Sequence, residues 1–283
     1  MTAVWTIAGY GLQEALRRKV FVVVCLLTVA FLFLYWIGNR YTFHHVTEVI
    51  PPAGIDARTF AGAFLFGMAM FGTLFLGVVL AVFLTLGVVR GDAERGLLQP
   101  LVVRPVGRST LLVARFLGAA AVCVPYVLGV YFATMVLTGL EGSWWPDRIV
   151  TPGLELAGGV LLVAALSLLG SVFLSSIANG IAVFMVFGAG LVAGLLGNIG
   201  HVLNSSGLVH AAKIAAWTVP FEALYQDALR TITEETSGLT GFLLRLGPFG
   251  GAEQGGVAVR LWALAYLLIV GTLALTGFAR RDL

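Results

Sequence analysis

Apolar residues in this chain gather into long unbroken runs, and short charged segments separate those runs. A helix needs roughly 20 apolar residues to cross the hydrocarbon core of a bilayer. The pattern predicts six transmembrane helices, with boundaries at about 20–38, 60–89, 111–140, 154–177, 181–202 and 257–278. We therefore expect an all-α integral membrane protein with a single transmembrane domain over residues 1–283.

Details within the runs refine this prediction. The run 60–89 is longer than a bilayer requires, so its helix should tilt or protrude. Pro125 removes one backbone hydrogen bond from the run 111–140 and should kink that helix. The stretch "ANG", residues 178–180, separates the fourth run from the fifth, which predicts a helical hairpin that turns there.

Two segments outside the runs are amphipathic. Residues 2–19 predict an interfacial helix with Trp5 as its aromatic anchor. Residues 203–256 form an external segment with two helical patterns broken at Pro220 and a flexible Gly-rich end. We expect its helices to rest on the outer leaflet or dip into it, with acids opposite an apolar stripe. That stripe consists of Phe221, Leu224, Tyr225, Ala228, Leu229 and Ile232.

The composition excludes a soluble protein. Hydrophobic residues make up 59% of the chain and charged residues 11%, whereas a soluble domain carries about 25% charged residues. The net charge is +3, but the basic residues lie at the ends of apolar runs, so we expect no nucleic acid partner. Cys25 and Cys123 lie inside apolar runs and predict reduced core residues. We also expect no cleavable signal peptide, because the first apolar run begins only after Lys19 and no cleavage site follows it.

The distribution of charge predicts the orientation. With six spans, both termini and the segments 90–110 and 178–180 lie on one side of the membrane. That side carries Arg17, Arg18, Lys19, Arg90, Arg95, Arg104, Arg108, Arg115, Arg280 and Arg281, against Glu14, Asp92, Glu94 and Asp282. The other side carries Arg40, Arg58, Arg148, Lys213, Arg230, Arg245 and Arg260 together with the remaining acids. This asymmetry predicts a multi-pass protein of the plasma (inner) membrane with both termini cytoplasmic.

Known catalytic and coupling patterns are absent from the sequence. It contains no H-E-x-x-H motif and no G-x-x-x-x-G-K-[ST] phosphate loop, so we do not expect the chain to be an enzyme by itself. Serines at 167, 171, 175 and 176 predict close helix packing and hydrogen bonds rather than nucleophiles. The spans are nearly free of ionisable residues, with Glu155 at the outer end of its run and Arg115 at the inner end of its own. Ion-coupled secondary transport is therefore poorly supported.

No metal site is expected. His44 and His45 are adjacent and would point to different faces of a helix, so only one of them could share a site with Glu48. Met68 and Met70 are two residues apart and likewise face differently, which argues against a copper relay. Lipid contact or helix contact is the better interpretation of these methionines.

The segment between the second and third runs calls for a binding partner. "RGDAERG" alternates acid and base, which suits a protein surface better than anionic lipid headgroups. "GLLQPLVVRP" is too short to span the membrane and too apolar to stay in water. "PVGRST" then predicts a turn, with Ser109 or Thr110 available to cap the next helix.

This segment resembles the signature of ABC-2 type transporter permeases, the membrane subunits of one class of ABC transporter. The family pattern places an acidic residue and a glycine before a leucine-rich coupling helix, followed by an R-P-V turn. The matching residues are Glu94, Arg95, Gly96, Leu97, Leu98, Arg104, Pro105, Val106, Gly107 and Arg108. The opening "EALRRKVF", the segment "VPFEALYQDALR" and the tail "FARRDL" are also similar to family segments and occur in the same order.

The resemblance implies a permease subunit of an exporter, without an ATPase of its own. Two ABC ATPase subunits, which hold ATP and Mg, would dock on the cytoplasmic loop 91–108, where the site residues would be Asp92, Glu94, Arg95, Gly96, Leu97, Leu98, Arg104, Pro105 and Arg108. A second permease chain, identical or related, would complete the transporter in the bilayer. Pro100 departs from the family pattern, because it falls where the coupling helix usually continues.

A second function class stays open. The chain could anchor an ATPase that does mechanical or regulatory work on the cell envelope while no substrate crosses. Both functions need the same docking loop. A transport pathway predicts a polar or aromatic lining at the interface between two chains, whereas an anchor predicts an occluded, fully apolar one. The transported substrate is not readable from the sequence.

Overall fold

The structure is a computed structural model that describes residues 19–48, 56–86, 108–233 and 256–280. These ranges contain eight α-helices and one short 3-10 helix, and no strand. The helices are α2 (Lys19–His44), α3 (Ala57–Thr85), α5 (Arg108–Gly142), α6 (Thr151–Phe173), α7 (Ser176–Val202), α8 (Ser206–Thr218), α9 (Phe221–Thr231) and α11 (Val257–Ala279), and the 3-10 helix is η1 (Val46–Glu48). The all-α prediction is confirmed for the described residues.

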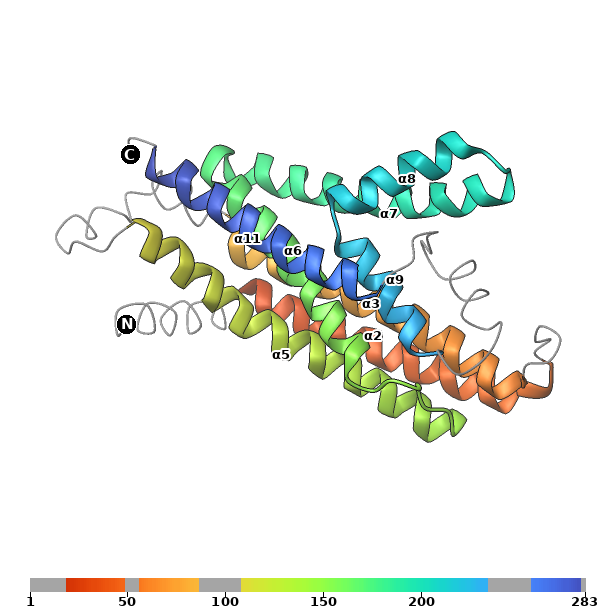
Figure 1. The fold of residues 1–283 in the computed structure, drawn as a ribbon. Coiled ribbons are helices and arrows are strands. Elements are labelled where there is room, and N and C mark those ends of the chain that lie inside the picture. Colours follow the sequence, from red (N-terminus) through yellow and green to blue (C-terminus); the bar gives the residue numbers. More distant parts are fainter. Residues whose placement is uncertain (1–18, 49–55, 87–107, 234–255, 281–283) are drawn as a thin grey trace.

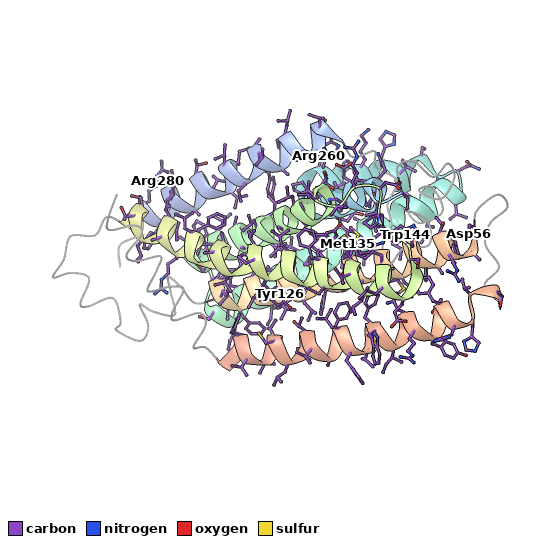
Figure 2. The ribbon with its side chains drawn as sticks, turned by 90° about the horizontal axis from the view of Figure 1, so that it is seen from below. Asp56, Tyr126, Met135, Trp144, Arg260 and Arg280 are labelled. Atoms are coloured by element: carbon purple, nitrogen blue, oxygen red, sulfur yellow. The ribbon has the colours of Figure 1, made fainter. Side chains whose placement is uncertain are left out.

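Six of these helices are long and apolar enough to cross a membrane, namely α2, α3, α5, α6, α7 and α11. This agrees with the six predicted spans and with a multi-pass membrane protein. The helix α2 begins at the same end of the bundle at which α11 ends (Figure 1). Figure 2 shows Arg280 at this end and Asp56 at the opposite one. The two ends are named the Arg280 end and the Asp56 end below.

The helices α3 and α6 form the centre of the bundle. Two thirds (67%) of the most apolar window of each is buried, compared with 11% for α2 and 22% for α11, which lie at the periphery. Small residues allow this close packing. A Cβ atom at Gly77 of α3 would lie 2.7 Å from Val127 and 2.8 Å from Val160, so any side chain there would separate α3 from α5 and α6.

Aromatic residues and caps fix the Asp56 end. Asp56 caps α3 by accepting hydrogen bonds from the backbone N–H groups of Arg58 (3.0 Å) and Thr59 (3.2 Å). Trp36 of α2 donates to Glu141 of α5 at 2.9 Å. Trp144, labelled near this end in Figure 2, packs onto the backbone at Gly62, where a Cβ atom would come within 2.8 Å. Tryptophan is typical of membrane–water interfaces, so this end has the character of an interface.

The turn between the fourth and fifth spans lies earlier than predicted. α6 ends at Phe173, Leu174 is extended (φ −108°, ψ 157°), and α7 begins at Ser176, so the spans do not reach 177 or begin at 181. Asn179 continues the helix because its side chain is fully buried and donates from Nδ2 to the carbonyl of Ser167 at 2.8 Å. The "ANG" stretch is therefore part of a packed helix, although asparagine and glycine are residue types that are typical of turns.

Proline does not end the third span. α5 continues from Arg108 to Gly142 through Pro125. Two polar contacts also join α5 to α2, since the hydroxyl groups of Thr28 and Tyr126, and those of Tyr35 and Thr138, lie within hydrogen-bond distance. These contacts hold the peripheral helix α2 against the bundle.

Candidate functional site

The segment after α7 folds back into the bundle as a re-entrant hairpin. α8 runs antiparallel along α7, and α9 then packs mainly on α6 (Figure 1). The connection between α8 and α9 consists of Val219 and Pro220. Pro220 lacks a backbone N–H and precedes the first residue of α9, where a missing donor costs little. The predicted break at Pro220 is thus the tip of this hairpin.

The hairpin tip lies well inside the membrane-spanning part of the bundle. Phe221 packs against Gly190 of α7 so closely that a Cβ atom there would lie 2.6 Å from its ring. Gly190 is twelve residues from the end of α7 at Val202, which corresponds to about 18 Å along the helix. Phe221 also stacks on Phe187, with ring centroids 4.9 Å apart. The hairpin therefore enters the membrane domain instead of resting on its surface.

Every residue of α9 from Phe221 to Leu229 is buried. The apolar stripe, which was expected to contact the outer leaflet, lies inside the helix bundle. The acids expected on an exposed opposite face are buried as well, because α9 is enclosed by α3, α6, α7, α8 and α11. The exposed fractions of Glu222 and Asp227 are 2% each, and that of Gln226 is 1%. The polar face of α9 is therefore enclosed by other helices.

A charge cluster joins α9 to two membrane spans. Nε of Arg260, in the first turn of α11, donates to Oδ2 of Asp227 at 3.0 Å and lies 2.7 Å from Oε1 of Glu155 in α6. The Glu155 side chain is 5% exposed and that of Arg260 39%. Figure 2 places Arg260 along the bundle between its two ends. We call Glu155, Asp227 and Arg260 the triad.

The triad corrects the expectation that the spans hold no buried charge. Glu155 was placed at the outer end of its run, and Asp227 and Arg260 were counted as charges outside the membrane. In the structure two carboxylates share one guanidinium inside a helix bundle. One sequence signal was available: Glu155 is the second residue of an apolar run, and a carboxylate that is buried there needs a positively charged partner.

Tyr225 fixes α9 on the other side, against α3. Its hydroxyl donates to the carbonyl of Gly67 at 3.4 Å, and the side chain is fully buried. A Cβ atom at Gly67 would lie 3.2 Å from Leu229, so α9 approaches the α3 backbone closely. The hairpin is thus attached to α3, α6, α7 and α11.

A second polar cluster lies at the Arg280 end. The hydroxyls of Thr85, the last residue of α3, and Ser167 of α6 are 2.7 Å apart, and Asn179 of α7 donates to the backbone of Ser167. Asn179 fits because α6 has glycine opposite it, since a Cβ atom at Gly170 would meet the Asn179 amide oxygen. These contacts join three helices directly beside the segment that follows α3. They agree with the packing role predicted for Ser167.

The predicted docking residues lie almost wholly outside the described part of the chain. Arg108 begins α5, and its side chain is not described. The other eight, Asp92, Glu94, Arg95, Gly96, Leu97, Leu98, Arg104 and Pro105, belong to residues 87–107. The interfacial helix predicted for 2–19 also lies outside, except for Lys19 at the start of α2. These assignments stay predictions.

The histidines near the Asp56 end form a local contact. The Nδ1 atom of His45 lies 3.0 Å from the carbonyl oxygen of Tyr41, and the His45 ring stacks on that tyrosine at 4.5 Å. Among the described residues, no group of three or more His, Cys, Asp or Glu side chains is arranged to hold a metal ion.

The sequence matches no protein-family model and no curated protein. The candidate functional features of this chain are therefore the re-entrant hairpin, the triad and the charged segment after α3.

Proposed function

We propose that this chain is the membrane-spanning permease subunit of an ABC-2 type exporter, driven by a separate ATPase that docks on residues 91–108. The permease works as a pair of chains, and each ATPase subunit supplies ATP and Mg. Binding of ATP brings the ATPases together, their movement shifts the docking loops, and the spans rearrange so that substrate passes outward. The chain itself hydrolyses nothing.

The order of motifs around residues 87–107 carries this proposal. The segment leaves α3 after Leu86 and enters α5 at Arg108. Both of these helix ends lie at the end of the bundle where α2 begins and α11 ends (Figure 1). The sequence concentrates its arginines in the same segments, which supports a cytoplasmic Arg280 end by the positive-inside rule. An ATPase at this end would meet the charged segment of both chains.

The triad changes one supporting argument. A lack of buried charge no longer argues against ion-coupled transport, since Glu155 and Asp227 are buried. Their shared guanidinium at 2.7 and 3.0 Å, however, joins three helices to one another. Mechanical coupling is therefore supported by the charged segment and its motifs, and the triad serves as a structural bridge between the three helices.

Exposed aromatic residues on α3 favour a transporter over a passive anchor. α3 is largely buried, yet Met68, Phe75 and Phe83 are 46%, 44% and 38% exposed. Their spacing of seven and eight residues places them on one face of the helix. Phe75 also contacts Phe187 of α7, with ring centroids 6.4 Å apart. A stripe of two phenylalanines and a methionine on a central helix suits the lining between two permease chains, because a transport pathway predicts aromatic residues there.

The first experiment is a mild-detergent purification of the chain from its native membrane, followed by mass spectrometry of the proteins that accompany it. We expect a soluble protein with a phosphate-loop motif in a one-to-one ratio with the chain. Crosslinking before solubilisation, through a thiol reagent at Glu94→Cys, captures a weakly bound ATPase. If crosslinking at that position yields no ATPase, the permease assignment is wrong.

A further inference from the structure

A narrow apolar groove runs between α5 and α11, with α6 as its floor. It has a volume of about 100 Å³, and its lining includes Leu112, Phe116, Ala165, Leu168, Gly271 and Leu275. On α11 the lining extends from Leu267 to Leu275, which corresponds to about 12 Å along the helix. The groove is therefore long, narrow and almost purely apolar.

Gly271 keeps the groove open. A Cβ atom built at this residue would have no other atom within 4 Å, so the missing side chain leaves space rather than allowing a close helix contact. Most close-packed glycines of the chain behave differently, because a Cβ atom at Gly77, for example, would collide with two valines. Neighbouring residues on α11 face outward, with Leu268 70% and Leu273 53% exposed. The groove thus opens towards the lipid.

Positive charge surrounds the end of the groove that faces the Arg280 end. Arg280 is exposed and lies five residues beyond Leu275, or about 7 Å along α11. Arg115 of α5 lies half-buried and directly precedes Phe116, which lines the groove. Both figures show the end of α11 beside the start of α5. In the described ranges near this end, 19–30, 75–86, 108–120, 162–185 and 270–280, the sequence has no Asp or Glu.

We propose that this groove binds one anionic phospholipid, with an acyl chain along α5 and α11 and the headgroup phosphate among the arginines of the Arg280 end. An apolar slot with arginines at its mouth, and no acid among the described residues there, matches such a molecule in both parts. Basic pockets between transmembrane helices on the cytoplasmic side bind anionic headgroups in this way. A protein partner fits less well, because a groove of about 100 Å³ is too small for a helix, which is about 10 Å across. The site is independent of the proposed transport function.

The first test fills the groove in the full-length chain. Gly271→Leu places a side chain in the open space, and Gly129→Leu on α5 is the matched control, since a Cβ atom there also meets nothing within 4 Å. The purified proteins are incubated with phosphatidylglycerol or phosphatidylcholine of identical acyl chains, and retained lipid is measured by native mass spectrometry. We expect the wild type and G129L to retain phosphatidylglycerol at least fivefold better than phosphatidylcholine, and G271L to lose that preference.

The second test removes the charge. Arg280→Gln should weaken phosphatidylglycerol binding about fivefold, because each basic residue near a membrane surface contributes on that order to anion attraction. Arg58→Gln, at the Asp56 end, is the control and should leave binding unchanged. Equal retention of the two lipids by the wild type, or full retention of phosphatidylglycerol by the Gly271 variant, would overturn the proposal.

A third measurement needs no variant and covers the case in which G271L fails to fold. Phosphatidylglycerol with a photoreactive group in its acyl chain is crosslinked to the unmodified chain, and the labelled peptides are mapped. Labelling should concentrate on residues 112–116 and 267–275 and should be competed by unlabelled phosphatidylglycerol but not by phosphatidylcholine. Labelling spread evenly over the exposed faces of α2 and α7 would contradict a specific site.

Discussion

Arg260 determines how the re-entrant hairpin is held. It carries a single guanidinium, and one nitrogen of that group contacts carboxylates from two different helices at 2.7 and 3.0 Å. Both carboxylates are nearly inaccessible, whereas 39% of the arginine side chain is exposed. Removing a buried charge partner is expensive, because the remaining charges lose their compensation in a medium of low dielectric constant.

We expect Arg260→Gln to lower the free energy of unfolding by about 2 kcal/mol, less than the ~3–5 kcal/mol typical of fully buried pairs because this arginine is partly exposed. The measurement is thermal unfolding of the purified chain in detergent. The triple variant Arg260→Gln, Glu155→Gln and Asp227→Asn should regain much of the loss, since no uncompensated charge remains. An Arg260→Gln variant as stable as the wild type would show that the triad contributes nothing to the fold.

At the scale of elements, α9 shows that an amphipathic pattern does not determine whether a helix lies on a membrane surface or inside a helix bundle. Its apolar stripe and its polar face are separated as they would be in a helix on a membrane surface. In the bundle, α6 covers most of the helix, and the polar face finds Arg260 instead of water. A helix of eleven residues is short for an element that stands inside a membrane domain, so its position depends on packing.

The contact between Phe221 and Gly190 tests that dependence. Gly190→Val should destabilise the chain by ~1–3 kcal/mol and displace the hairpin tip, because its Cβ atom would already lie 2.6 Å from the Phe221 ring. Gly188→Val is the control on the same helix, since a Cβ atom there meets nothing within 4 Å, and it should change stability by less than ~0.5 kcal/mol. Thermal unfolding of both variants decides the matter, and equal stability would mean that the tip does not pack against α7.

At the scale of the whole molecule, the described helices place Arg280 at one end of the bundle and the contacts of Trp144 near the other. The Thr85–Ser167–Asn179 cluster includes the last residue of α3, and Figure 2 shows Arg260 of the triad between the two ends of the bundle. α6 belongs to both clusters, through Ser167 and Glu155. α6 is therefore the helix that connects the two polar clusters.

The proposed docking segment is tested by reversing its charges. Glu94→Lys combined with Arg95→Glu should abolish the ATP hydrolysis that the permease stimulates in its partner ATPase, while membrane insertion stays intact. Asp147→Lys with Arg148→Glu reverses an equivalent neighbouring pair at the Asp56 end and should leave hydrolysis unchanged. The assay uses the reconstituted complex, and unchanged turnover in the first double variant would show that the ATPase docks elsewhere.

The sequence by itself determined the six spans, the basic end and the resemblance to a permease. Hydrophobic length and charge bias are local properties of each segment. They can therefore be recognised without knowing which other segments pack beside it. The turn before Ser176 could not be located from the sequence pattern. Asn179 and Gly180 are of residue types that favour turns, but here they pack against other helices.

Only the tertiary structure decided the environment of the polar residues. Asp227 and Arg260 are 33 residues apart and meet only because the hairpin re-enters the bundle. Whether a carboxylate near the end of an apolar run faces water or a guanidinium depends on which distant segment packs beside it, and periodicity carries no information about that partner. The lipid groove has the same origin, since three helices must come together before the missing side chain of Gly271 becomes an open space.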